Sequence, residues 1–191
     1  MSMQEKIDAA CQTFRGLVAH EAVVADASRA IVEALRTGHR ILSCGNGGSA
    51  AEAMHLSTEL TGRYKADRIS LPAIFLGADS SLVTCIANDY GWDEIFARAL
   101  KGNARHGDIL VAFTTSGNSQ NVVRALETAR EMAVASVALL GKGGGACRGL
   151  ATWEVIIDSP ETERIQEAHQ FLLHVMCDAV EAAFVPQRAR A

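Results

Sequence analysis

The sequence has no long run of like charges, no hydrophobic stretch long enough to span a bilayer, and no pair of cysteines spaced C-x-x-C. Its 18 Lys and Arg residues and 22 Asp and Glu residues give a formal net charge of −4, which argues against a basic surface that follows a nucleic acid. The longest apolar stretches, such as residues 134–140, fall far short of the roughly 18 residues that a membrane-spanning helix needs. We therefore expect neither nucleic acid nor a membrane as a partner.

The cysteines point to a reducing compartment. They are odd in number and widely separated, which argues against a disulfide framework and against a zinc ribbon. The first residues include Glu5 and Asp8 and contain no continuous apolar segment, so a secretory signal is not expected. We expect a cytoplasmic protein in which all five cysteines are reduced and have no part in the chemistry: Cys11, Cys44, Cys85, Cys147 and Cys177.

The length of the chain predicts one domain. At about 150 residues per domain, 191 residues leave little room for a second one. Apolar residues make up 49% and charged residues 21%, and a globular chain of this size buries roughly 70% of its unfolded surface. Because no repeat, linker or low-complexity segment divides the sequence, we predict a single domain over 1–191, with N-terminal helices over 1–38 and an α/β core with a C-terminal helix over 39–184.

Hydrophobic periodicity predicts a helical pair followed by alternating strands and helices. Apolar residues recur every three or four positions over 7–17 and again over 27–35, and Gly38 is suited to end the second helix. Short apolar runs without alternation are typical of a parallel sheet with helices on both faces. We expect strands near 39–44, 73–76, 109–113, 134–140 and 154–157, and helices over 50–60, 81–87, 122–133 and about 161–184.

The loop after the first strand, residues 45–50, has the form G-x-G-x-x-A of a loose dinucleotide fingerprint. A dinucleotide site also needs a second strand that ends in an acidic residue about 20 positions further on. Asp67 has this spacing but lies in a polar segment with no strand before it, so dinucleotide binding is disfavoured. Two interpretations remain: a glycine turn that merely joins strand to helix, or a loop whose N–H groups and Ser49 face an anionic or polyhydroxy ligand.

The loop over 114–119 holds four hydroxyl groups between a buried strand and a helix. Hydroxyls and free N–H groups at a helix N-terminus, where the helix dipole is positive, suit a terminal phosphate. Because no Lys follows Gly117, the loop is not a Walker loop. A simple helix cap by Asn118 or Ser119 would leave the other hydroxyls unexplained, so we favour phosphate binding.

Two helices carry polar side chains that could do chemistry. His55 and Glu59 are four residues apart and share a helix face, where they could hold a proton, a metal or a substrate, or form only a surface hydrogen bond. The last helix adds Gln166, His169 and His174 within an otherwise apolar stretch. Buried polar groups of this kind need partners, although a lone core histidine is more often structural than catalytic.

The informative motifs lie in five segments, at 44–51, 55–59, 87–91, 115–119 and 164–169. Together, these segments closely resemble the phosphoheptose isomerases of the sugar isomerase (SIS) domain family. The resemblance runs from about residue 5 to residue 184. It implies a parallel sheet flanked by helices and a homotetramer with active sites at subunit interfaces. It also implies conversion of sedoheptulose 7-phosphate, through an enediol or enediolate, to D-glycero-D-manno-heptose 7-phosphate for the heptoses of bacterial surface polysaccharides.

The resemblance also implies roles for individual residues. Glu59 and His174 match catalytic positions, and His55, Glu59, Gln166 and His174 match positions that bind zinc in metal-containing members, which implies one zinc ion per subunit. The positions expected to contact the sugar phosphate are Asn46, Gly47, Ser49, Asp89, Thr114, Thr115, Ser116, Ser119 and Gln166.

Some positions fit this assignment less well. Gln166 and His174 lie eight residues apart, about 12 Å along an ideal helix, so His169 is geometrically the easier partner of Gln166. The resemblance favours His174, and we assign His169 a supporting role. Thr114 stands where serine is more usual, and Glu163 stands where many relatives carry a small residue or aspartate, which could alter substrate preference.

Two other classes of protein compete with an enzyme. A non-catalytic SIS-fold protein that associates with a replication initiator would reuse the phosphate loop without needing His55, Glu59, Gln166 and His174 together. A sugar-phosphate-sensing regulator would carry a DNA-binding helix-turn-helix, for which the 38 residues before the first strand leave no room. The joint presence of the four side chains favours an isomerase.

Overall fold

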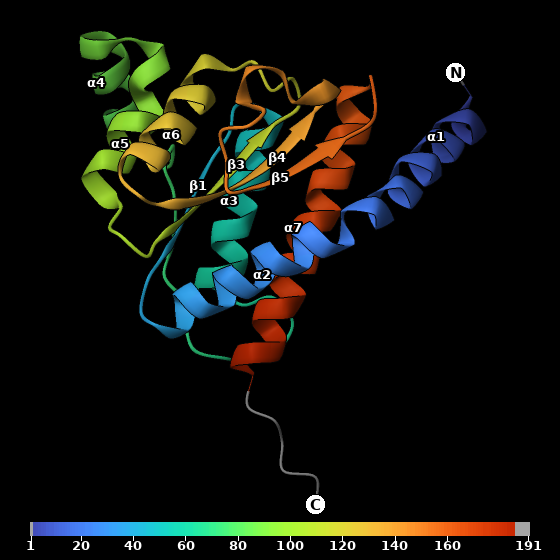
Figure 1. Ribbon diagram of the computed structural model, residues 1–191, viewed down its shortest axis with the longest axis horizontal. Helices are drawn as coiled ribbons and strands as arrows, with labels where there is room; N and C mark the ends of the chain where they lie inside the picture. The colour runs from blue at the N-terminus through green and yellow to red at the C-terminus, as the bar shows by residue number, and fades with distance from the viewer. Residues whose placement is uncertain (1, 186–191) are drawn as a thin grey trace, which may run out of the picture.

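The computed structural model describes residues 2–185, so residue 1 and residues 186–191 of the predicted domain lie outside the description. Five parallel strands form one sheet in the order β2-β1-β3-β4-β5, with helices on both faces (Figure 1). The predicted fold class is therefore confirmed. The strands are β1 Ile41–Cys44, β2 Ala73–Phe75, β3 Ile109–Thr114, β4 Ala135–Gly141 and β5 Trp153–Ile157.

An N-terminal helical pair precedes the sheet, as predicted. Helix α1 (Met3–Gly16) continues through a short 3-10 turn into α2 (Glu21–Arg36). Gly38 adopts a φ of 84° directly after α2, the left-handed conformation that a glycine at a helix C-terminus supplies without strain. Helix α1 itself buries none of its own residues and projects from the body of the protein (Figure 1).

Alternate strand residues enter two separate hydrophobic cores. Val111 and Phe113 of β3 face the core beneath α2, α3 (Gly48–Thr61) and α7 (Thr162–Phe184), whereas Leu110 and Ala112 face the opposite core. Because both faces of the sheet are covered, its central strands are apolar throughout. The second core lies beneath α4 (Ser80–Tyr90), α5 (Ile95–Asn103) and α6 (Gln120–Glu131).

Helix α5 is absent from the elements expected from the sequence. Its buried side chains include Ile95, Phe96, Ala99 and Leu100, two pairs spaced four residues apart, so the helical signal was present in the sequence. The other expected elements differ from the observed ones by a few residues at their ends. Within residues 2–185, no helix is both long and apolar enough to cross a membrane.

The parallel register brings two loops to one edge of the sheet. Ile41 pairs with Ile109 and Cys44 with Ala112, so β1 and β3 end side by side. In open sheets of this kind ligands bind beyond the carboxyl ends of the strands. The glycine loop after β1 (residues 45–50) and the hydroxyl loop after β3 (residues 114–119) therefore face the same space.

Candidate active site

The loops after β1 and β3 are joined by a pair of amides. Asn46 and Asn121 each donate from Nδ2 to the other's Oδ1, at 2.8 and 2.9 Å. Asn121 is 1% exposed and lies in the first turn of α6, so this pair fixes the glycine loop against the start of that helix. Ser49 is buried in the first turn of α3, and the predicted residues Asn46 and Gly47 precede it in the loop.

Some hydroxyls of the loop after β3 accept hydrogen bonds from the backbone of the same loop. The Thr114 hydroxyl accepts a hydrogen bond from the Gly117 N–H at 3.2 Å and lies 3.5 Å from the Ser119 hydroxyl. The Ser116 hydroxyl accepts from the Asn118 N–H at 3.1 Å. Within the described part of the chain, Ser119 stands at the N-cap of α6 without a capping side-chain hydrogen bond. The hydroxyls of this loop thus surround the positive end of a helix.

Gly117 is required at the turn of this loop. Its φ of 65° lies in the left-handed region. A Cβ atom there would lie 2.0 Å from the carbonyl oxygen of Gly144, in the segment after β4. The same segment is tied to the loop by the Ala146 N–H, which donates to Asn118 Oδ1 at 3.0 Å. The backbone after β4 therefore closes one side of the hydroxyl loop.

Helix α7 meets the glycine loop through Gln166. A Cβ atom on Gly48 would lie 2.1 Å from Gln166 Nε2, so the amide of Gln166 rests directly on the backbone at the start of α3. A side chain at position 48 would displace this amide. Gln166 is thereby placed beside the loop that is predicted to contact the sugar phosphate.

A continuous chain of hydrogen bonds links α3 to α7. His55 Nε2 lies 2.7 Å from Glu59 Oε1, and His55 Nδ1 lies 2.8 Å from Gln170 Nε2. The same Gln170 nitrogen lies 3.1 Å from His174 Nε2. The ring of Tyr64 stacks on His174 with centroids 5.7 Å apart. Three predicted site residues, His55, Glu59 and His174, are therefore together, and Gln170 rather than Gln166 stands between the two imidazoles.

His169 lies on the inner side of α7, away from these imidazoles. It is fully buried, and its Nε2 donates to the carbonyl oxygen of Leu140 at 3.3 Å. Its Nδ1 lies 3.6 Å from Glu52 Oε2, and among the described residues neither atom has a hydrogen-bond partner. His169 thus packs in the core beneath α7.

Two residues singled out in the sequence lie apart from this group. Asp89 is exposed near the end of α4, where its carboxylate accepts from Asn88 Nδ2 at 2.8 Å. Glu163 is exposed in the first turn of α7. No hydrogen bond or ion pair found among residues 2–185 connects either carboxylate to His55, Glu59 or His174.

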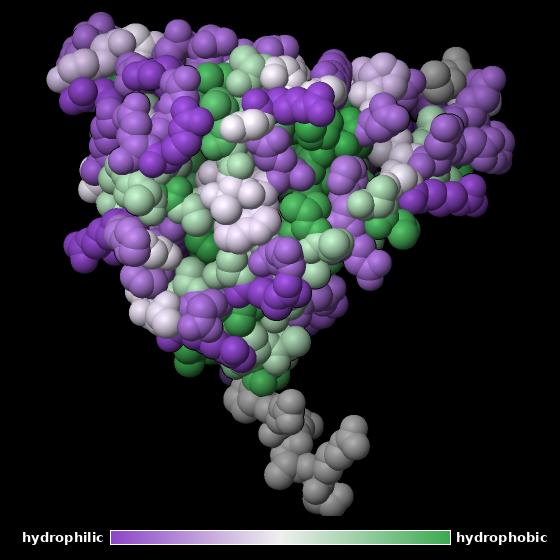
Figure 2. Space-filling model, viewed as in Figure 1, coloured by the Kyte–Doolittle hydropathy of each residue, from purple (hydrophilic) through white to green (hydrophobic). Residues whose placement is uncertain are grey.

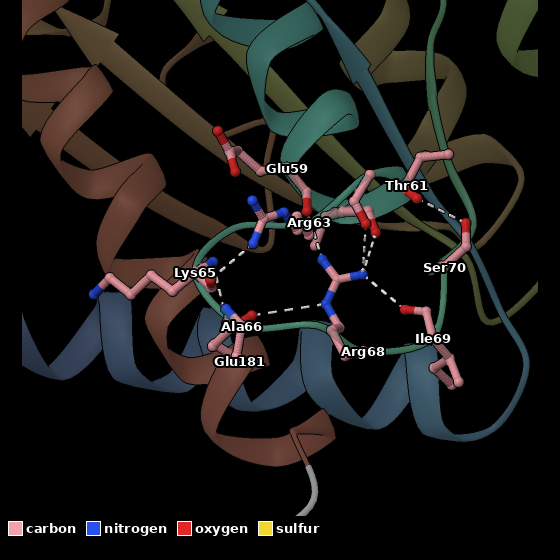
Figure 3. A network of polar contacts seen from close by, with 11 residues as sticks. Glu59, Thr61, Arg63, Lys65, Ala66, Arg68, Ile69, Ser70 and Glu181 are labelled. Carbon is pink, nitrogen blue, oxygen red and sulfur yellow. Dashed lines mark hydrogen bonds and ion pairs between the residues drawn. The ribbon is translucent and has the colours of Figure 1, made fainter.

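Arg68 fixes the end of α3 that carries Glu59. Its side chain is 1% exposed, and its guanidinium donates to the carbonyl oxygens of Glu59, Leu60 and Ile69 (Figure 3). A cation at these carbonyls complements the negative end of the helix dipole. The Glu59 carboxylate points away from this network (Figure 3). Its Oε1 lies within hydrogen-bonding distance of His55. Arg68 therefore positions Glu59 through its backbone and leaves its carboxylate to His55.

Glu181 connects the same network to α7. Its Oε1 accepts from the backbone N–H groups of Lys65 and Ala66, and its Oε2 lies 3.7 Å from Arg68 Nε. The segment between α3 and β2 is thereby held against α7 (Figure 3). The two helices that carry the hydrogen-bonded chain are thus fixed to each other by buried charge.

The cysteines fit the expectation that they are not reactive. All five are free, and Cys44, Cys147 and Cys177 are buried. Burial raises the pKa of the Cys147 and Cys177 thiols to about 12 in each case and raises that of Cys44 as well. At neutral pH these thiols are protonated and are poor nucleophiles.

Comparison with known proteins identifies the family of this chain. The SIS domain model matches residues 7–141. The phosphoheptose isomerase of Campylobacter concisus is 48% identical over 158 residues, covering 83% of this chain and 84% of that protein. The structure of the phosphoheptose isomerase from Neisseria gonorrhoeae superimposes with a TM-score of 0.85 at 34% identity, covering 95% of this chain and 100% of that one. The chain belongs to the phosphoheptose isomerase family. The expectation of an isomerase is thereby confirmed.

Sequence reasoning missed several residues of the candidate site. The predicted site residues are contacted by four residues that the sequence analysis did not single out: Asn121, Tyr64, Arg68 and Gln170. Gln170 lies one helical turn from both Gln166 and His174, so its spacing along α7 could have revealed it. The contacts of Asn121 and Arg68 link separate elements and leave no local pattern in the sequence.

Loss of Arg68 should destabilise the fold. Replacing it by Leu leaves Glu181 and several helix-end carbonyls buried without their cation, which costs about 3–5 kcal/mol. Urea unfolding at a fixed protein concentration measures this loss. Arg105→Leu is the matched control, because Arg105 is exposed and such changes stay within about 0.5 kcal/mol. Equal stability of the two variants would contradict a structural role for Arg68.

Proposed function

We propose that the protein interconverts sedoheptulose 7-phosphate and D-glycero-D-manno-heptose 7-phosphate, an aldose–ketose isomerisation that supplies heptose for bacterial surface polysaccharides. The observation that carries the proposal is the Glu59 carboxylate, hydrogen-bonded to His55 and joined through Gln170 to His174 on the facing helix. The names of the related proteins support the choice of substrate. The cytoplasmic location expected from the cysteines is part of the same proposal.

The phosphate is proposed to bind in the loop over 114–119. The loop that leads into α6 carries four side chains with hydroxyls, Thr114, Thr115, Ser116 and Ser119, and the helix dipole favours an anion there. Ser49 and the amide pair of Asn46 lie beside it at the start of α3. Binding energy from the phosphate would hold the reacting carbons of the sugar in place.

Glu59 is proposed to move the proton between C1 and C2. The isomerisation removes a proton from one carbon and returns it to the next through an enediolate, and one carboxylate can do both. His55 holds Glu59 Oε1 at 2.7 Å, which leaves Oε2 available to the sugar. His174 is proposed to exchange protons with the two sugar oxygens, because imidazole gains and loses protons near neutral pH.

Zinc is proposed as the cofactor, one ion per subunit. Two imidazoles, a carboxylate and an amide form a nitrogen and oxygen donor set that suits zinc. His55 and His174 have ring centroids 5.3 Å apart, although within residues 2–185 no group of three or more His, Cys, Asp or Glu side chains is arranged to hold a metal ion. The zinc ion would be held by His55, Glu59, His174 and Gln166. A bound zinc ion would stabilise negative charge on the sugar oxygens as a Lewis acid.

A homotetramer is proposed on the basis of an apolar groove. The groove, of about 960 Å³, lies between the N-terminal helices and α7, and Phe14, Leu17, Val18, Val24 and Phe171 are among its lining residues. Val18 is 71% exposed and Phe171 45% exposed. Hydrophobic surface is also visible near the base of α1 (Figure 2). Contiguous apolar surface of this kind is typical of protein interfaces, and a neighbouring subunit of the proposed tetramer would cover it.

Glu59→Gln tests the proposed base. The amide keeps the shape of the side chain but cannot take a proton, so kcat for sedoheptulose 7-phosphate should fall by at least about 10²-fold. Sugar-phosphate binding should remain measurable by calorimetry. Glu131→Gln, an exposed change at the end of α6, is the control. Near-normal turnover by Glu59→Gln would rule out its role as the base.

Metal removal tests the proposed cofactor. Protein dialysed against a chelator should lose most of its aldose formation from sedoheptulose 7-phosphate and regain it with stoichiometric zinc. Full activity after verified removal of metal would contradict a zinc requirement. Absence of product both with and without the chelator would favour the non-catalytic SIS-fold protein instead.

Val18→Asp tests the proposed tetramer. A charge in the groove would have to be buried at the interface, so the variant should dissociate while the wild type elutes with the mass of four chains. Light scattering after size exclusion gives both masses. Val18→Leu keeps the groove apolar and should leave the mass unchanged. A wild type with the mass of one chain would overturn this part of the proposal.

A further inference from the structure

One face of α7 contacts the segment that follows α3, residues 64–66. This face is formed by three side chains spaced i, i+4 and i+7 along the helix: His174, Asp178 and Glu181. The ring of Tyr64 stacks on the first of them, and the ammonium group of Lys65 pairs with the second. The third accepts hydrogen bonds from two backbone N–H groups of the segment (Figure 3). The segment is therefore docked along α7, with its first residue against a residue of the candidate site.

The contact between Tyr64 and His174 is a stack of two flat rings. Their centroids are 5.7 Å apart and their planes are 21° from parallel, an offset arrangement that aromatic rings favour. The ring of His55 meets His174 at a steep angle, with centroids 5.3 Å apart and planes at 78°. Two neighbouring rings thus fix the plane of the His174 imidazole, one by its face and one by its edge.

Stacking constrains the plane of an imidazole without using its nitrogens. The contact is made through the face of the ring, whereas the hydrogens and lone pairs of the two nitrogens lie in the ring plane and point outward. The zinc site and the proton transfers proposed above both need those nitrogens. Tyr64 therefore orients His174 in a way that is compatible with a bound metal ion or sugar.

Buried contacts, rather than exposed ones, hold Tyr64 in place. The ion pair between Lys65 and Asp178 is exposed, with 60% and 52% of the two side chains accessible, and such pairs contribute little. Glu181, which binds the backbone next to Tyr64, is 9% exposed and faces the buried guanidinium of Arg68 at 3.7 Å. The network that fixes the end of α3 therefore also fixes the ring that stacks on His174.

We infer that Tyr64 is a positioning residue that sets the ring plane of His174 by stacking on it. This inference rests on the proposed function, in which His174 exchanges protons with the sugar. The phosphate is proposed to bind in the loop over 114–119, which belongs to other elements of the fold. Loss of Tyr64 should therefore slow turnover without weakening substrate binding.

Two substitutions separate the flat face of Tyr64 from its hydroxyl group. Tyr64→Phe keeps the face, and Tyr64→Leu removes it while keeping an apolar side chain. Trp153→Leu is the matched control, because Trp153 is a half-buried aromatic residue that packs on the same core. It lies at the start of β5, at the end of the sheet opposite the loops of the site. Loss of aromatic packing alone would affect both leucine variants alike.

Proton NMR of the full-length protein reports the stack directly. The protein is kept with a chelator at about pH 9, where imidazole side chains are neutral. The wild type and Tyr64→Phe should both show a nuclear Overhauser effect between the ring protons at position 64 and those of His174. In Tyr64→Leu, the ring protons of His174 should lose the shielding of the stacked ring and move downfield. Trp153→Leu should leave them unchanged.

Steady-state kinetics of the zinc-loaded protein on sedoheptulose 7-phosphate provides the second readout. Tyr64→Leu should lose about 10- to 100-fold in kcat, as outer partners of a site typically do, with KM within about twofold. Tyr64→Phe should stay within about twofold of the wild type in kcat, because it keeps the stacking face. Trp153→Leu should behave like Tyr64→Phe.

Unchanged His174 shifts in Tyr64→Leu would overturn the inference, and so would a kcat for that variant equal to that of Trp153→Leu. The NMR result does not depend on turnover. A wild type without isomerase activity, whose His174 shifts still follow the ring at position 64, would therefore refute the proposed function while supporting the stacking contact. If Tyr64→Leu does not fold, Tyr64→Met takes its place, because the flexible methionine side chain fills irregular spaces.

Discussion

The buried guanidinium of Arg68 holds together the two helices on which the site is built. It binds the last carbonyls of α3 and faces Glu181 of α7, and Glu181 in turn binds the backbone of the segment after α3. A buried cation is tolerated only when many acceptors surround it, so this arrangement has little freedom. The contact between His55 on α3 and Gln170 on α7 requires the spacing between these two helices that the Arg68 network maintains.

The site has two halves with different physical origins. The half that we propose binds phosphate comes from the sheet, because parallel strands bring the loops after β1 and β3 to one edge, where Asn46 and Asn121 hydrogen-bond to each other. The half that we propose transfers protons comes from the packing of α3 against α7 over the core on one face of the sheet. Gln166 joins the halves, since its amide rests on Gly48 where α3 leaves the glycine loop.

Local sequence predicted the elements that bury continuous apolar runs. The third strand, expected over 109–113, is Ile109–Thr114, and the last helix, expected over about 161–184, is Thr162–Phe184. The helix Ile95–Asn103 was missed although its apolar pairs are evident. The pairing of His55 with Glu59 was predictable because both lie on one helix face, four residues apart.

The sequence by itself determined the family, the sheet class and the polar side chains of α3 and α7, because motifs and periodicity depend only on near neighbours along the chain. The tertiary structure alone decided which of those side chains meet. His55 and Gln170 are 115 residues apart, and Asn46 and Asn121 are 75 apart. Such contacts depend on how helices and loops pack on a shared core, so the position of Gln170 between the two histidines was not predicted from the sequence.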